Sequence, residues 1–304
     1  EQEKQQITQL VRHWVVPAIG CTEPICVALA TSRAVEALGS LPTHIEARLS
    51  ANILKNAMGV GIPGTGMVGL PIAIALGALI GRSTYGLEVL RDCNAEAVAR
   101  GKQFIAEDRI NISLKSDTEK LYVEIVAADA DGHQATVVIA REHTRFVYIA
   151  KDNEVEVDLL HETPQDSDAT DSEALQTDKL QLNLHKVWEY ATTMPLADIE
   201  FINEARRLNK RAAQLSLEGN YGHCLGKALS RPLGRGIMGD NIFSHILSST
   251  SCACDARMAG AMIPVMSNSG SGNQGICATN PVVVFAEENH NTAEEMTRAL
   301  MLSP

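Results

Sequence analysis

The strongest constraint on the fold is a change of periodicity in the middle of the chain. Residues 110–150 consist of short runs rich in Val, Ile and Tyr, whereas most segments on either side carry apolar residues at helical spacing. Asp131-Gly132 and Asp152-Asn153 mark turns beside such runs, which favours antiparallel hairpins. The sequence therefore predicts an α+β protein, in which a mostly helical body carries an inserted α+β subdomain with an antiparallel sheet.

These patterns also predict where the parts of the chain begin and end. Residues 1–40 and 178–304 are expected to form the helical body, and residues 41–160 the α+β subdomain. The acidic, polar segment 161–177 is interpreted as a linker or exposed loop. Helices are expected over residues 5–16, 23–38, 66–81, 86–107, 180–193, 197–216, 221–229 and 242–249. Strands are expected over residues 44–50, 110–114, 121–128, 134–141 and 145–150.

Charge and composition exclude several classes of partner. The 26 basic and 37 acidic residues give a net charge of −11, and no basic stripe exists to contact phosphates, which argues against nucleic acid and anionic membranes. The best membrane candidate, residues 66–81, is shorter than the ~20 residues of a spanning helix and contains Pro71, so a buried helix is the better interpretation. Seven cysteines without a visible secretory signal indicate reduced thiols in a cytoplasmic protein.

Both ends of the chain suggest a part of a longer protein. The sequence lacks an initiator Met, and residues 299–304 stop within an apolar helical pattern. The oligomeric state is not fixed by the sequence, and a homodimer is one possibility.

A polar, glycine-rich segment stands out near the C-terminal end. Nine of the ten residues from Met266 to Gly275 are Ser, Asn, Gly or Gln, and apolar segments flank them. Such a loop costs free energy unless its polar groups find partners, and a small molecule with a carboxylate is one such partner. An ordinary turn is an equally good interpretation of this segment alone.

Cys21 is a second candidate, because it stands just ahead of an expected helix start. The helix dipole and the free N–H groups there stabilise a thiolate. A buried structural cysteine is the competing interpretation. Cys252, Cys254 and Cys277 lack the spacing of a common metal site and are interpreted as structural, and His143 is expected at a strand edge.

The segment Gly59–Gly64 matches the pattern GxGxxG, but the region after it is helical and Pro63 removes a backbone N–H, which argues against dinucleotide binding. Asn52, Lys55 and Asn56 precede this turn, and Gly64-Thr65-Gly66 leads toward a helix start that could bind an anion. A structural turn is the alternative.

Several short motifs, in this order, resemble the L-cysteine desulfidase family, which includes the UPF0597 proteins and is related to the α portion of iron–sulfur L-serine dehydratases. The motifs are Gly20-Cys21-Thr22-Glu23-Pro24, Asn52-Ile53-Leu54-Lys55-Asn56, Pro63-Gly64-Thr65-Gly66, His143-Thr144, Asp255-Ala256-Arg257-Met258 and Ser267–Gly275. The resemblance spans essentially the whole chain.

The resemblance implies a lyase that uses a [4Fe–4S] cluster to convert L-cysteine to pyruvate, ammonia and hydrogen sulfide. It implies that Cys21 binds the cluster or acts as a catalytic thiolate, with Lys55 and His143 as further catalytic groups. The implied substrate-binding residues are Asn52, Asn56, Ser267, Asn268, Ser269, Gly270, Ser271 and Asn273.

The resemblance also places most cluster-ligating cysteines beyond residue 304, so this chain is expected to lack the cluster and to be inactive by itself. A related lyase acting on L-serine and a non-catalytic module that binds small amino acids remain the alternatives.

Overall fold

A computed structural model describes residues 2–160 and 181–304. The described residues form two compact units, and each is treated by itself. The sheet unit comprises residues 19–160 and 259–262, and the helical unit comprises residues 2–18, 181–258 and 263–304. The segment 161–177, expected to be a linker, lies outside the described residues.

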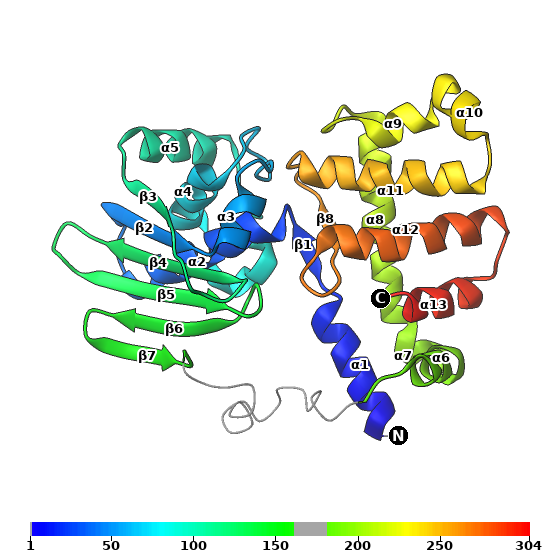
Figure 1. Ribbon diagram of the computed structural model, residues 1–304, viewed down its shortest axis with the longest axis horizontal. Coiled ribbons are helices and arrows are strands. Elements are labelled where there is room, and N and C mark those ends of the chain that lie inside the picture. The colour runs from blue at the N-terminus through cyan, green and yellow to red at the C-terminus, as the bar shows by residue number, and fades with distance from the viewer. Residues whose placement is uncertain (1, 161–180) are drawn as a thin grey trace. The chain divides into compact units, whose positions relative to one another are not determined.

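The sheet unit is built on one mixed sheet with the strand order β3-β2-β4-β5-β6-β7 (Figure 1). Its strands are β2 (His44–Leu49), β3 (Ile110–Leu114), β4 (Tyr122–Ala128), β5 (Gln134–Ala140), β6 (Phe146–Lys151) and β7 (Glu154–Asp158). Its helices are α2 (Thr22–Leu38), α3 (Ala51–Ala57), α4 (Leu70–Ile80), the 3-10 segment η1 (Ser83–Glu88) and α5 (Ala95–Ala106).

The core of the sheet unit lies between α2 and one face of the sheet. Alternate residues of β4 and β5, among them Ile125 and Val137, are fully buried, as expected for a sheet with one covered face. Helix α2 contacts β4, β5 and β6, and α4 packs against α2 and α5. The close approach of α4 to α2 requires Gly77, where an added Cβ would lie 2.6 Å from the carbonyl oxygen of Ala28.

Two features of the sheet correct the predicted antiparallel arrangement. Strands β2 and β3 pair in parallel, because the segment between them contains α3, α4 and α5 and returns the chain to the same end of the sheet. The remaining pairs are antiparallel, as predicted. Strand β7 was not expected, since its sequence, Glu-Val-Glu-Val-Asp, is strongly acidic.

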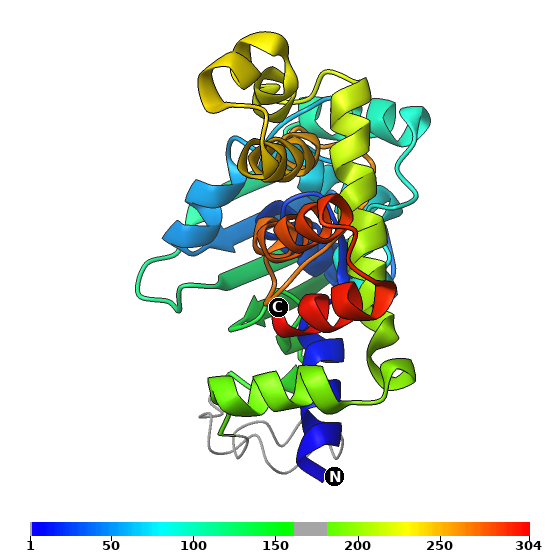
Figure 2. The same ribbon diagram turned by 90° about the vertical axis from the view of Figure 1, so that its right-hand side faces the viewer.

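The helical unit contains most of the helices (Figure 1). These are α1 (Gln2–Trp14), α6 (Leu184–Thr193), α7 (Leu196–Ile199), the 3-10 turn η3 (Glu200–Ile202), α8 (Asn203–Glu218), α9 (Leu225–Ser230), α10 (Pro232–Met238), α11 (Ile242–Met258), α12 (Gly272–Glu288) and α13 (Ala293–Leu302). The short strands β1 (Pro17–Ile19) and β8 (Pro264–Met266) pair to form a two-stranded sheet. Helices α11 and α12 lie side by side and both cross α8 (Figures 1 and 2).

The structure confirms the predicted α+β class and corrects several helix boundaries. Helix α11 continues to Met258, nine residues past the predicted end at Ser249, because its small Ser, Cys and Ala residues pack against α8 and α9. Helix α12 begins at Gly272, inside the segment expected to be a loop. Helix α2 belongs to the sheet unit, although residues 1–40 were expected in the helical body, because nearly all its sides are buried there.

The helix expected over residues 86–107 is broken. Gly86 adopts φ 54° and ψ −127°, and the Asn94 side chain caps a new helix that begins at Ala95. Among residues 2–160 and 181–304, no helix has the length and apolar character needed to cross a membrane.

Candidate functional site

Cys21 occupies the position immediately before α2 in the sheet unit. It is the N-cap residue of that helix, and its side chain is buried. The chain enters this position through Gly20, whose φ of 79° favours glycine. A Cβ at Gly20 would lie 2.5 Å from Cγ of Pro63, so glycine also permits the close approach of the Pro63-Gly64 turn. The motifs around Cys21 and Pro63 are therefore neighbours in space.

Glu23 joins the polar groups around Cys21. The Cys21 thiol donates to Oε2 of Glu23 at 2.9 Å, and the Thr22 hydroxyl donates to the same oxygen at 3.2 Å. The Asn56 amide donates to Oε1 at 3.4 Å. The negative charge of this cluster is therefore carried by a carboxylate placed in the first turn of α2, where the helix dipole favours it.

The surroundings of Glu23 lower the pKa of its carboxyl group. Burial acts to raise the pKa, but hydrogen bonds from the Cys21 thiol, the Glu23 backbone N–H and the Thr22 hydroxyl, together with the nearby His143, hold it below its ordinary value of 4.5. Glu23 is therefore ionised at neutral pH. Burial and the Glu23 charge raise the pKa of the neighbouring Cys26 thiol, which is fully buried in the core of the sheet unit.

The three predicted residues of α3 share one helical face. Asn52, Lys55 and Asn56 stand at positions i, i+3 and i+4, which are neighbours on a helix surface. Asn56 reaches Glu23, whereas the side chains of Asn52 and Lys55 are exposed. His143, in the turn between β5 and β6, lies near enough for its charge to act on Glu23. The sheet unit thus gathers Cys21, Asn56 and His143 around one carboxylate.

The glycine-rich turn at residues 59–64 follows α3, so it does not connect a strand directly to a helix as a dinucleotide-binding loop would. Instead, it packs against the residues 259–262. An added Cβ at Gly61 would lie 2.4 Å from the carbonyl carbon of Ala259, and the Gly64 N–H donates to the carbonyl of Gly260 at 3.1 Å. These contacts give the turn a structural role.

The loop from Ser267 to Ser271 lies in the helical unit, between β8 and α12. Its turn is tight: Ser269 and Gly270 have φ values of 48° and 75°, and Asn268 and Ser271 form an isolated bridge. The Ser267 side chain is fully buried and donates to the carbonyl of Val16, and the Ser271 side chain caps α12 by accepting from the N–H of Gln274.

The remaining loop residues differ in their surroundings. Asn268 is buried and donates to the carbonyl of Pro304, and the exposed Ser269 donates to the side chain of Asn268. Asn273, in the first turn of α12, accepts a hydrogen bond from Nη1 of Arg257 at 2.9 Å. Of the six predicted residues in this loop, Asn273 is thus the one placed beside a cation.

Sequence reasoning did not assign a role to Glu23 or Arg257. Both lie inside the recognised motifs, and a charged residue in a segment that is otherwise apolar or small is the signal that could have identified them. Burial makes such a charged residue a candidate for a functional role, and only the structure shows it: Arg257 is 3 % exposed.

The cysteines of the helical unit have different surroundings. Cys252 is fully buried, and burial raises the pKa of its thiol to about 11. Burial also raises the pKa of Cys254 to about 12, and this thiol contacts the exposed Cys277. Within the described part of the chain, no group of three or more His, Cys, Asp or Glu side chains is arranged to hold a metal ion.

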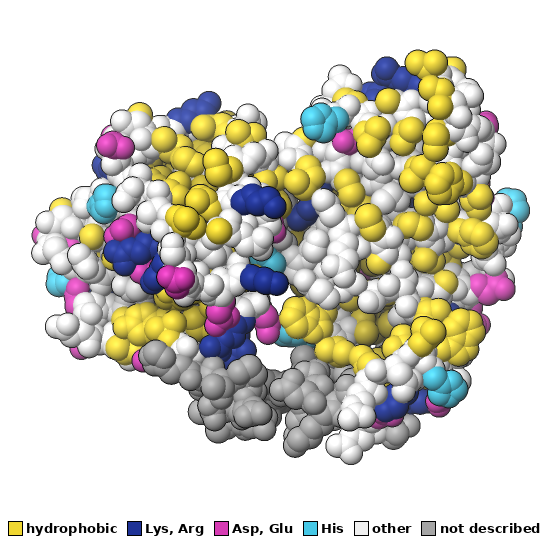
Figure 3. Space-filling model, viewed as in Figure 1, with side chains coloured by type: hydrophobic (Ala, Val, Ile, Leu, Met, Phe, Trp, Pro, Cys, Tyr) yellow, Lys and Arg dark blue, Asp and Glu magenta, His cyan; other side chains and the backbone are white. Residues whose placement is uncertain are grey.

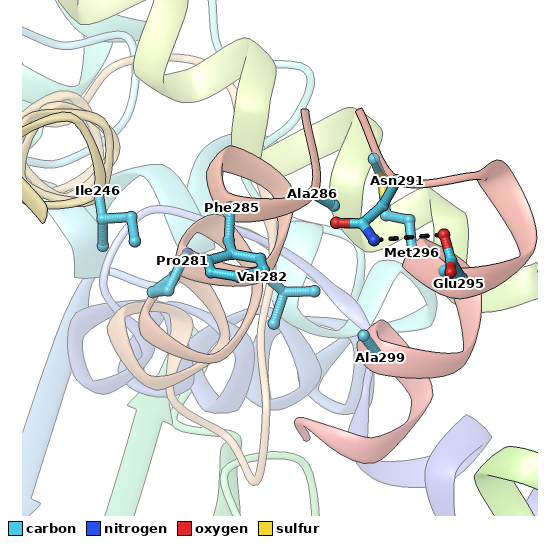
Figure 4. Close-up of a pocket in the computed structure, with 9 residues that line it drawn as sticks. All are labelled: Ile246, Pro281, Val282, Phe285, Ala286, Asn291, Glu295, Met296 and Ala299. Carbon is cyan, nitrogen blue, oxygen red and sulfur yellow. Dashed lines mark hydrogen bonds between the residues drawn. The ribbon is translucent and has the colours of Figure 1, made fainter. Parts of the chain in front are cut away.

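A cavity of about 410 Å³ also lies in the helical unit, lined by residues of α11, α12 and α13 (Figure 4). Its walls are mainly apolar, and its polar groups include the hydrogen-bonded side chains of Asn291 and Glu295. It contains none of the predicted site residues. Its chemistry therefore does not suit a small, doubly charged amino acid.

Comparisons with known proteins agree with the motifs. The family model described as "Serine dehydratase alpha chain" matches residues 84–304. A UPF0597 protein of Bacteroides thetaiotaomicron is 63 % identical over 304 residues, which cover 100 % of this chain and 69 % of the relative. A UPF0597 protein of Porphyromonas gingivalis is 45 % identical over 301 residues, covering 99 % and 69 %. No solved structure matches the chain.

The alignment with the Bacteroides thetaiotaomicron relative spans the whole chain, so its range includes the segments around Cys21 and before α12. The identity and coverage exceed what chance or a shared fold alone would give. The chain therefore belongs to the UPF0597 family, which is related to the α chain of serine dehydratases.

Proposed function

We propose that the protein containing this chain is an L-cysteine desulfidase, a carbon–sulfur lyase of cysteine catabolism in the cytoplasm. The observation that supports this most is the cluster at the start of α2, where the Cys21 thiol donates to the ionised Glu23 and Asn56 and His143 stand beside the same carboxylate. Thiol, carboxylate and imidazole groups together can position a substrate and carry a proton.

In the proposed reaction, a base takes the α-proton of L-cysteine, the carbon–carbon double bond forms and the C–S bond breaks with its electron pair on sulfur. The products of this step are hydrogen sulfide and 2-aminoacrylate, which reacts with water to give pyruvate and ammonia. Lys55 and His143 are the proposed proton-handling groups, and the ionised Glu23 holds the Cys21 thiol in place. Asn52, Asn56 and the loop residues Ser267–Ser271 and Asn273 are the proposed substrate-binding groups.

The cofactor of the proposed enzyme is a [4Fe–4S] cluster, as the resemblance implies. A [4Fe–4S] cluster takes about four thiolate ligands, whereas the described residues offer no group of three metal-binding side chains. The described residues 2–160 and 181–304 therefore do not by themselves fit the cluster. We propose Cys21 as one ligand, with the others supplied from beyond residue 304. When bound, such a cluster supplies an iron that acts as a Lewis acid.

L-serine is the second candidate substrate, and the match to the serine dehydratase α chain favours it. Loss of hydroxide from L-serine and of hydrosulfide from L-cysteine require nearly the same groups. A non-catalytic module that binds small amino acids is the remaining alternative.

Side-by-side assays decide between these functions. A protein of the relatives' full length, prepared without oxygen, is given L-cysteine or L-serine, and sulfide, ammonia and pyruvate are measured. We expect a higher kcat/KM for L-cysteine and a loss of about 100-fold or more in Cys21→Ser. Cys224→Ser, which changes a cysteine of the helical unit, is the matched control. Unchanged turnover in Cys21→Ser would contradict the role of this thiol, and amino-acid binding without any turnover would favour the binding module.

A further inference from the structure

Arg257 is a buried cation that forms no ion pair with any described residue. It ends α11 and is 3 % exposed, yet no described carboxylate lies within ion-pair distance of its guanidinium group. Its nitrogen Nε is buried and has no hydrogen-bond partner, and Nη1 donates to neutral atoms only, Oδ1 of Asn273 and Sδ of Met258. Burying a charge in this way is costly unless an anion compensates it.

The surroundings of Arg257 carry further positive potential. Its guanidinium group packs on Gly272, the first residue of the 17-residue helix α12. The backbone N–H groups of Gly272 and Asn273 stand in the first turn, where a helix provides no acceptors for them. The Asn273 amide turns its oxygen toward Arg257, which leaves its NH₂ group as an additional donor.

Glycine at position 272 is required by this packing. An added Cβ would lie 2.2 Å from Nε and 2.7 Å from Cζ of Arg257. A side chain at this position would displace the guanidinium group, so the structure reserves the space against the first turn of α12 for the arginine. The local sequence thus holds a cation where the helix dipole already favours an anion.

The acidic groups on the elements around Arg257 are engaged elsewhere. The Asp255 carboxylate accepts from the backbone N–H of Gly226. At the far end of α12, Glu287 pairs with Lys210 and Arg206, and Glu288 pairs with His245. No acidic residue occurs in the loop between β8 and α12.

We propose that Arg257, Asn273 and the first turn of α12 form a binding site for a carboxylate, which in the reaction is the α-carboxylate of the amino-acid substrate. The planar guanidinium group suits a carboxylate, and the first-turn N–H groups add donors that select for negative charge. The identification of the ligand as an amino acid rests on the proposed function. The presence of a carboxylate site in the helical unit does not depend on the proposed function, because it is inferred from the surroundings of Arg257.

Two thiols of equal length provide the probes. 3-Mercaptopropionate carries a carboxylate and no amine, whereas cysteamine carries an amine and no carboxylate. Isothermal titration of the 304-residue chain is expected to show binding of 3-mercaptopropionate and none of cysteamine. In Arg257→Gln, the affinity for 3-mercaptopropionate is expected to fall by about 10- to 100-fold, the loss expected for a charge-assisted hydrogen bond.

Arg231→Gln is the matched control, because it removes an exposed arginine of the same unit that makes no ion pair with a described residue. Circular dichroism establishes whether Arg257→Gln is folded. Should it fail to fold, Asn273→Ala replaces it, since this side chain is only half-buried and the loss of its amide is expected to weaken binding several-fold.

The inference would be overturned if Arg257→Gln, or Asn273→Ala in its place, bound 3-mercaptopropionate as tightly as the wild-type chain. It would also be overturned if the wild-type chain bound both probes alike or bound neither. The result is separable from the lyase proposal. Binding that depends on Arg257 in a protein without lyase turnover would support the site and contradict the proposed function. Turnover of L-cysteine together with 3-mercaptopropionate binding that is unchanged in Arg257→Gln would support the proposed function and contradict the carboxylate site.

Discussion

Glu23 shows how one side chain can change the meaning of a motif. From the sequence, Cys21 is the chemically interesting residue of its motif, because a thiol at a helix start is favoured as a thiolate. In the structure, the thiol donates its hydrogen to Glu23, and the carboxylate also accepts from Thr22 and Asn56. The charge therefore resides on Glu23 in this chain.

Replacing Glu23 by Gln is expected to make stability less dependent on pH. The folded-state pKa of Glu23 is below 4.5, so its ionised form stabilises the fold above that value, and the contribution is lost as the pH falls through the folded pKa. We expect Glu23→Gln to cost about 1 kcal/mol at neutral pH and progressively less as the pH falls below 4.5 through the folded-state pKa of Glu23. Urea unfolding across this range measures the difference. A cost that is constant or grows toward acid pH would contradict the assignment.

At the scale of elements, Asn94 explains why one predicted helix is shorter than its pattern. The apolar residues from Leu87 to Ile105 keep helical spacing, but the Asn94 side chain accepts from the N–H of Ala97 and fixes the helix start at Ala95. Local capping chemistry thus outweighs a longer periodic pattern.

Asn94→Ala is expected to destabilise the sheet unit by about 1 kcal/mol, because it removes the acceptor that satisfies a first-turn N–H group of α5. Denaturant unfolding followed by circular dichroism measures this loss. Asn94→Asp retains an acceptor oxygen and adds a charge that the helix dipole favours, so it should be close to the wild type. Equal losses in both variants would show that the cap is not responsible.

At the scale of the molecule, the burial of the cysteine side chains can be tested with one thiol reagent. The seven cysteines all lie in the described part of the chain, form no disulfide with one another, and span the range from fully buried to exposed. In the native chain, we expect a thiol reagent to label Cys277 first, and to label Cys26 and Cys252 only after unfolding. Both buried thiols have a raised pKa, which is about 11 for Cys252, so their reaction should be slower by about 100-fold or more.

Peptide mapping of the labelled chain identifies the order. Cys277→Ser should remove the fastest phase and leave the slow phases unchanged. Rapid labelling of Cys26 under native conditions would contradict the packing of α2 on the sheet.

The exposed face of the helical unit is unusually apolar for so acidic a chain (Figure 3). Leu233, Ile237 and Phe243 are 78 %, 75 % and 58 % exposed, and they lie on α10 and the start of α11.

Helix α10 was not expected from the sequence, because its seven residues include Pro232 and two glycines. Short helices of this kind depend on tertiary contacts more than on propensity.

The sequence by itself determined the α+β class, the core strands of the sheet, most helices and the family, because periodicity and motifs are properties of neighbouring residues. It also located the two segments that carry polar groups, around Cys21 and before α12. Only the tertiary structure decided the parallel pairing of β2 with β3, the partners of Glu23 and the burial of Arg257. These depend on residues far apart in the chain, such as Glu23 and Asn56. The missing hydrogen-bond partner of Arg257 Nε can likewise be recognised only from the placed side chains around it, within the part of the chain that the structure describes.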